Sequence, residues 1–314
     1  MANSSGVVEN WLPEGKKGAI CFSIDDLHPQ KSPTRKSDGF YEGGGDLGKG
    51  AMGHVLRLLD RHPGLRVTLF TTADWRETFS HPTRRILAAI PRLRDHLWLA
   101  PRHPKGTMRL DRHPEFVDFL KNDPRFEIAL HGLHHCHKGL RVPVEFQDQS
   151  REEFDRILGE IVRVFRLAGL PFEPGLCPPG WNAPENLLGA MPGRGLRFVA
   201  SARDVLTPVS RNAKTNMSGM KNVSLIHPER ICGGKLLHFT ANFQATSEWG
   251  RAFDILENNG LLHIKAHITG GMLDSVCALY MNYLDQLLSE IEKRHGDSIL
   301  HTSMGSLAKQ ILPA

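Results

Sequence analysis

GAICFSIDD, from Gly18 to Asp26, is the stretch that decides the fold. Its apolar run, 18–24, is typical of a buried β-strand, and the adjacent aspartates Asp25 and Asp26 end it. Two neighbouring carboxylates at the end of an apolar strand are costly unless a positive group lies beside them. Such a pair on its own is more often a turn or a helix cap, so the rest of the chain must decide between a structural and a chemical role.

Six further strand candidates follow, separated by helical patterns. Ser150 and Glu153 form a capping box at the start of one helix. Strands that alternate with helices indicate an α/β fold with a parallel sheet, open or closed into a barrel. Polar residues that follow such strands are candidates for an active site, because sites in these folds lie beyond the carboxyl ends of the strands. The predicted strands are 65–72, 126–131, 172–179, 196–204, 260–268 and 298–304, and the predicted helices are 51–64, 150–169 and 273–294.

The domain organisation is predicted to be simple. No internal repeat, low-complexity tract or linker interrupts the sequence, so we expect a single domain over 1–314, with loop insertions at about 28–50 and 205–245. The segment GGGDLGKG (Gly43–Gly50) resembles a phosphate-binding P-loop, but Gly50 stands where Ser or Thr would bind Mg²⁺, and no strand precedes it. We interpret it as a flexible insertion and a candidate lid.

Composition indicates a globular cytoplasmic protein. The 314 residues are 40% hydrophobic and 23% charged, and no apolar run reaches the length of a transmembrane segment. The N-terminal residues lack the pattern of a secretory signal. Five cysteines without CxxC spacing favour a reducing compartment.

The positive net charge does not predict nucleic-acid binding. The net charge is +5 and the pI is about 9.0, yet the basic residues are dispersed and no aromatic stacking pattern accompanies them. They are denser between Arg84 and Arg112, where we expect a solvated basic face; an anionic small substrate or a lipid surface is the alternative.

A histidine cluster, ALHGLHHCHKG from Ala129 to Gly139, follows the third predicted strand. His131 and His135 are four residues apart, a spacing that lets two imidazoles reach one ion; His134 is an alternative partner for His131. Two histidines with Asp26 from another strand end would form an open metal site with three protein ligands. Zn²⁺ and other divalent first-row metals suit this donor set.

These segments carry a resemblance to a known family. FSIDDLHP, HGLHH, CPPGW and LLHIKAH, in this order, resemble the successive motifs of the polysaccharide deacetylases, also called the NodB-homology or carbohydrate esterase 4 family. The resemblance extends from Gly18 to the last predicted strand. It implies a distorted (β/α) barrel of about seven parallel strands.

The resemblance also implies a role for each matching residue. Asp25 matches the catalytic base, and His267 matches the general acid. Asp204 matches the carboxylate that holds this histidine. The residues that match the metal ligands are Asp26, His131 and His135.

The third motif departs from the family pattern. Cys177 stands where the family has an arginine that orients the base, and Arg203 is a conceivable substitute. Gly180 falls where a backbone N–H would face the oxyanion. Trp181 would form an apolar wall against the acetyl group or the sugar, although plain packing beside two prolines explains it equally well.

The sequence therefore predicts a metal-dependent hydrolase that deacetylates an N-acetylated amino sugar. Zn²⁺ is the expected cofactor. The expected substrate is a sugar or sugar phosphate, as an intracellular precursor of a surface polysaccharide; the oligomeric state stays open. Hydrolysis of another non-peptide C–N bond, as in an imide or ureide, is an alternative, and a pseudoenzyme that only binds carbohydrate is another. A non-haem iron oxygenase fits less well, because such enzymes usually have an all-β scaffold.

Overall fold

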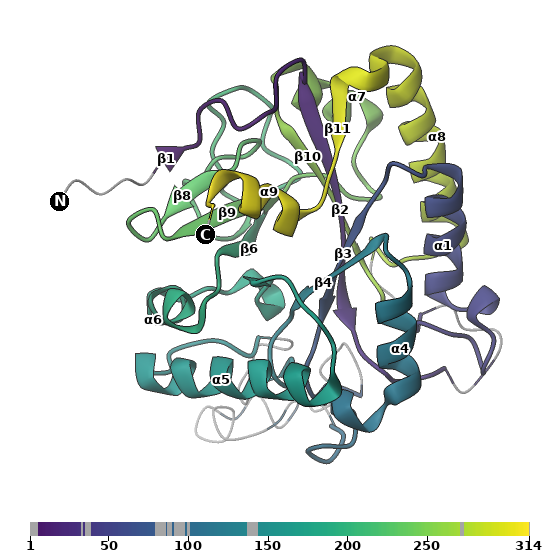
Figure 1. Cartoon of the computed structure of the whole chain (residues 1–314), viewed down its shortest axis with the longest axis vertical. Helices are drawn as coiled ribbons and strands as arrows, with labels where there is room; N and C mark the ends of the chain where they lie inside the picture. The colour runs from purple at the N-terminus through teal and green to yellow at the C-terminus, as the bar shows by residue number, and fades with distance from the viewer. Residues whose placement is uncertain are drawn as a thin grey trace.

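The computed structural model describes residues 6–32, 34, 39–78, 86, 90, 98, 101–136, 144–270 and 273–313. One mostly parallel sheet forms its centre, and helices pack around the sheet (Figure 1). Within the described ranges, no helix is long and apolar enough to cross a membrane.

Seven parallel strands of the described chain form a distorted barrel. Neighbours pair in parallel in the order β9-β6-β5-β4-β3-β2-β10. Phe243, just after β9, completes the ring through a parallel bridge to Ile264, and its carbonyl accepts the N–H of Lys265 at 2.9 Å. The α/β fold class and the barrel are thus confirmed. The seven strands are β2 (Gly18–Leu27), β3 (Val67–Thr71), β4 (Phe126–Leu130), β5 (Gly175–Leu176), β6 (Phe198–Arg203), β9 (Leu236–Ala241) and β10 (Leu261–His267).

One barrel strand differs from the sequence-based expectation. β9 lies inside 205–245, which we expected to be a loop insertion; its six residues are all buried, and β6 pairs with it. The short apolar run of β9 gives no period that separates it from a buried loop. The strand expected at 298–304 is present only as β11 (Ile299–His301), which pairs with the start of β2 outside the ring. The remaining strands are β1 (Gly6–Val7), β7 (Ser218–Gly219) and β8 (Glu229–Ile231).

The helices agree closely with the sequence pattern where capping signals mark them. The hydroxyl of Ser150 accepts the N–H of Glu153 at 3.2 Å, and Gly169 ends this helix in a left-handed conformation with φ of 63°. The last long helix begins at Ala278, five residues later than expected. The α-helices are α1 (Ala51–Arg61), α4 (Pro114–Asn122), α5 (Arg151–Ala168), α6 (Glu185–Ala190), α7 (Trp249–Glu257), α8 (Ala278–His295) and α9 (Met304–Ile311); the 3-10 helices are η1 (Leu47–Lys49), η2 (Leu110–Arg112), η3 (Pro179–Trp181), η4 (Met191–Arg194) and η5 (Gly296–Ser298).

Two hydrophobic clusters separate the inside of the barrel from its outer layer. Ala19 and Cys21 of β2 belong to the inner cluster, whereas Ile20 and Phe22 join the outer cluster with the surrounding helices. The inner cluster includes α9, which packs at the amino-terminal ends of the strands, where Ser303 and Gly305 bind Glu127. The carboxyl-terminal ends are therefore the side where a site can form.

Candidate active site

The two aspartates that end β2 both contribute to one cluster of buried polar side chains. Asp25 lies on the inner face of the barrel and pairs in register with His267 of β10. Adjacent strand residues normally point to opposite faces, but Asp26 adopts a positive φ of 66°, and the pairing of β2 with β3 shifts register after Ile24. This irregularity lets both carboxylates turn inward, where each is only 2% exposed.

A buried glutamate shapes the loop that carries the histidines. The carboxylate of Glu145 accepts the N–H groups of Leu133, His134 and His135 at 2.9, 3.0 and 3.1 Å. A Cβ at Gly132, where φ is +82°, would lie 2.3 Å from the Glu145 Oε2, so this position requires glycine. The loop is thus held by hydrogen bonds to one side chain.

Asp26, His131 and His135 converge at the centre of the pocket. The Nε2 atoms of His131 and His135 lie 3.1 and 2.9 Å from the same oxygen, Oδ1 of Asp26. The Nδ1 of His131 lies 2.7 Å from the Cys177 carbonyl, and the Nδ1 of His135 lies 2.7 Å from a Glu77 carboxylate oxygen. Since a carbonyl and a carboxylate only accept, both Nδ1 atoms donate, and both Nε2 atoms face the same oxygen of Asp26.

This donor set fits a divalent metal. Two imidazole nitrogens in contact with one carboxylate oxygen are repelled by it unless a proton or a cation lies between them. Burial works to lower the pKa of His135, yet Asp26 and Glu77 outweigh it and raise that pKa to about 10. Thr269 donates to the other oxygen of Asp26 at 2.8 Å. Hydrogen-bonded imidazoles and an oriented carboxylate are the usual surroundings of a bound metal.

An aromatic stack supports one of these histidines. The ring of Trp75 lies between two imidazoles, with centroid distances of 4.3 Å to His28 and 4.4 Å to His135. Its Nε1 donates to the carbonyl of Glu77 at 2.7 Å. Trp75 therefore fixes the plane of His135 from one face.

Asp25 is paired with a lysine, not with an arginine. The Nζ of Lys265 lies 3.0 Å from Oδ2 of Asp25, and the Cys177 thiol donates to the same oxygen at 3.2 Å. The second oxygen, Oδ1, has no hydrogen-bond partner among the described residues. Arg203 was the sequence-based substitute for the missing arginine, but its guanidinium binds the amide oxygen of Gln244 at 2.8 Å. Lys265, and not Arg203, therefore takes the place of the missing arginine beside Asp25.

His267 is paired with a carboxylate that the sequence did not indicate. Its Nδ1 lies 2.9 Å from Oδ1 of Asp274. Burial opposes ionisation of Asp274, but His267 outweighs it and lowers the pKa of this carboxyl to about 2. The assignment of Asp204 as the histidine's partner is corrected: Asp204 accepts from the hydroxyl of Thr207 and from backbone N–H groups, including that of Asn216, and organises the loop after β6.

Comparisons with known proteins agree with this architecture. A protein described as a polysaccharide deacetylase, from Mycobacterium smegmatis, superposes with a TM-score of 0.57 at 13% identity, over 99% of this chain and 94% of that one. This chain has the polysaccharide deacetylase fold. Puue allantoinase shares the fold, with a TM-score of 0.53 at 13% identity, over 95% of this chain and 91% of that one. No family model matches the sequence, and no curated protein does.

The third sequence motif, CPPGW, lies beside His267 and Lys265. Gly180 and Trp181 lie in η3 with positive φ values of 64° and 57°. The Trp181 ring meets the His267 ring edge to face at 6.0 Å, and the Nζ of Lys265 lies 4.7 Å from the centroid of the indole. Trp181 thus lies beside the expected acid, and its role as a wall against the acetyl group or the sugar stays a prediction.

Sequence reasoning missed four residues of this candidate site. Lys265 carried a signal, because a lysine between histidines in an otherwise apolar strand is unusual. Asp274 lies in a loop, and Glu77 and Glu145 belong to segments without a recognisable motif. Their positions depend on tertiary contacts, so no local pattern could have identified them.

His134 and Cys136, the other described candidates of the histidine cluster, do not join the contacts around Asp26. The Nδ1 of His134 lies 3.1 Å from the carbonyl of Asp74, which holds this ring away from Asp26. Cys136 is buried, and burial raises the pKa of its thiol. His137 falls outside the described residues, as do Arg84, Arg85, Arg92 and Arg94 of the basic region.

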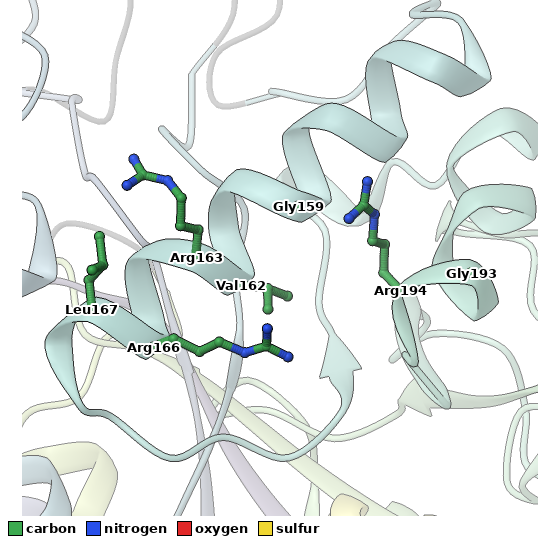
Figure 2. A pocket seen from close by; sticks show the side chains of 7 residues that line it. All are labelled: Gly159, Val162, Arg163, Arg166, Leu167, Gly193 and Arg194. Atoms are coloured by element: carbon green, nitrogen blue, oxygen red, sulfur yellow. The ribbon is translucent and has the colours of Figure 1, made fainter.

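A separate surface groove lies between α5 and η4 (Figure 2). Arg163 and Arg194 form ion pairs with Glu160 and Asp155. None of the residues that line the groove belongs to the pocket around Asp26. The lining residues are Gly159, Val162, Arg163, Arg166, Leu167, Gly193 and Arg194.

Proposed function

We propose that this protein is a metal-dependent hydrolase that removes the acetyl group from an N-acetylated amino sugar. The observation that carries the proposal is the convergence of Asp26, His131 and His135 on one point, beside a carboxylate and a histidine that each have their own partner. Its position at the carboxyl ends of a deacetylase-like barrel supports the same conclusion.

Asp26, His131 and His135 would hold the metal in this proposal. When bound there, a divalent ion such as Zn²⁺ polarises the acetamide carbonyl and lowers the pKa of a water molecule. The donor set favours Zn²⁺ and is compatible with other first-row metals.

The remaining residues of the pocket have distinct roles. Asp25 accepts a proton from the attacking water at Oδ1, the oxygen that has no protein partner in the described chain. His267 donates a proton to the leaving amine, and Asp274 holds its ring. Trp181 packs against the acetyl group or the sugar, and the N–H of Gly180 faces the developing oxyanion.

We propose an intracellular precursor of a surface polysaccharide as the substrate. The described cysteines, which are all unpaired, are consistent with a cytoplasmic protein. A phosphate on the sugar would match the net charge of +5. Activity on polymeric chitin, with none on soluble acetamido sugars, would contradict this substrate class.

Hydrolysis of a cyclic ureide is the second candidate. It is favoured by the shared fold with Puue allantoinase and by the lysine that replaces an arginine beside Asp25. Ring opening of allantoin would separate it from the deacetylase proposal.

The test combines metal analysis with product analysis. The purified protein is assayed for bound metal, for acetate release from N-acetylglucosamine, its 1-phosphate and chitin oligomers, and for opening of allantoin. Asp26→Ala and His131→Ala should lose the metal and all turnover. His134→Ala is the matched control and should retain both. Full metal occupancy in Asp26→Ala and His131→Ala would refute the site, and metal without turnover would indicate a pseudoenzyme.

A further inference from the structure

Lys265 is a buried cation inside the barrel. Its side chain lies on the inner face of β10, two residues before His267, and is 2% exposed. Lysine is almost never buried to this extent without a charged partner. Its Nζ forms one ion pair within the described chain, with Oδ2 of Asp25 at 3.0 Å.

All three donors of this ammonium group have a neighbour. One lies toward Asp25, and a second toward Nε2 of His267 at 2.8 Å. The Trp181 ring, 4.7 Å from Nζ, offers its π system to the third. An ammonium group donates and never accepts, so in the resting site Nε2 of His267 accepts while Nδ1 donates to Asp274; Nε2 must take up a proton from water before His267 can act as the acid.

We propose that Lys265 is a positioning residue that fixes the proposed base Asp25 and the proposed acid His267 relative to one another. The inference rests on the proposed function. One ammonium group spans the two, so a single residue of β10 sets the orientation of the carboxylate and the tautomer of the imidazole. Cys177 fills the space beside the carboxylate but carries no charge, since burial and Asp25 raise the pKa of its thiol.

The direction of the carboxylate follows from these contacts. Lys265 and Cys177 both occupy Oδ2 of Asp25, so the carboxylate presents Oδ1 to the pocket. Without the lysine, nothing in the described chain would hold Oδ2 by a charge. A buried carboxylate left without its cation rotates, or binds a proton and ceases to be a base.

The test uses two substrates that differ in their need for an acid. p-Nitrophenyl acetate releases p-nitrophenolate, a stable leaving group that needs no proton. An acetamido sugar releases an amine, which must be protonated as it leaves. Lys265→Met keeps the length of the side chain and removes its charge. We expect kcat to fall about 100-fold on p-nitrophenyl acetate, through the base alone, and further on the acetamido sugar, which also needs the acid; KM and metal content should stay almost unchanged. Turnover within about threefold of wild type on both substrates would overturn the proposal.

A second variant moves the charge to Cys177, the residue that follows β5 and donates to the same oxygen of Asp25. Lys265→Ala with Cys177→Arg keeps the total side-chain volume nearly constant and restores a cation beside Asp25. Its kcat on p-nitrophenyl acetate should be at least about tenfold higher than that of Lys265→Ala alone. It should recover less on the acetamido sugar, because the contact with His267 is not restored. Failure to recover either activity would overturn the role of the charge.

Stability measurements test the contact without any turnover. If Lys265→Met does not fold, Asp25→Asn in the same chain should restore folding, because it removes the unpaired carboxylate. A double variant that also stays unfolded would refute Asp25 as the partner. If the wild type binds metal but hydrolyses neither substrate, the proposed function fails. A double-mutant cycle of Asp25 and Lys265, measured in the free energy of unfolding, then still tests whether the two side chains form an ion pair.

Discussion

Nδ1 of His267 lies 2.9 Å from Oδ1 of Asp274, a carboxylate seven residues further along the chain. The pair fixes which nitrogen of the ring carries the proton. Asp274→Asn keeps the shape of the side chain but loses the charge that supports an imidazolium. We expect kcat on an acetamido sugar to fall about 100-fold, with a much smaller change on p-nitrophenyl acetate, and steady-state kinetics on both substrates check this.

Asp204→Asn is the matched control for this prediction. Asp204 accepts from the loop after β6 and makes no hydrogen bond to His267. The variant should melt at a lower temperature and keep its turnover number. A larger loss of turnover in Asp204→Asn than in Asp274→Asn would restore the role that the sequence assigned to Asp204.

Glu77 should control metal affinity without being a ligand. It accepts the Nδ1 proton of His135, and a partner of this kind raises the affinity of the ligand for the metal. Glu77→Gln should weaken metal binding about 10–100-fold, measured by competition with a chelator, and leave the fold intact. Unchanged affinity would show that this hydrogen bond does not tune the site.

Glu145 should couple the stability of the histidine loop to metal binding. Glu145→Ala leaves the N–H groups of Leu133, His134 and His135 without their acceptor, at a cost of about 1–3 kcal/mol for each that stays buried. We expect a lower melting temperature and weaker metal binding. Glu229→Ala is the control, because this glutamate accepts the N–H of Ser224 away from the site and should reduce stability alone. Equal metal affinity in both variants would contradict the coupling.

His238 should make the protein sensitive to moderate acid. Its imidazole is fully buried, neither nitrogen has a partner in the described chain, and burial lowers its pKa from 6.5 to about 3. Between these values the unfolded chain binds a proton that the folded chain does not. Stability is therefore complete above about pH 6.5 and falls with decreasing pH by up to about 1.4 kcal/mol per unit. His238→Leu should flatten this slope in urea titrations at pH 4–7, and an unchanged slope would assign the acid sensitivity to other groups.

The sequence predicted those parts of the structure that local patterns encode. The strand before Asp25, the capped helix after Ser150 and the HxxxH spacing of the histidines all depend on neighbours in the chain. The side chains that contact the proposed base and acid depend instead on tertiary contacts. Asp274 reaches His267 only because the loop after β10 folds back, and Lys265 reaches Asp25 only because β10 pairs with β2 in one register. The sequence does not indicate β9, because its six buried residues give no hydrophobic period.

Because Trp75 stacks between His28 and His135, its fluorescence can report on metal binding at the site. An indole in contact with an imidazole is quenched most strongly when that imidazole carries a proton, and a metal on His135 would displace that proton. Emission from Trp75 should therefore change as the site fills, and Trp75→Phe should abolish that change while the other four tryptophans remain. Occupancy can thus be followed in solution before any substrate is known.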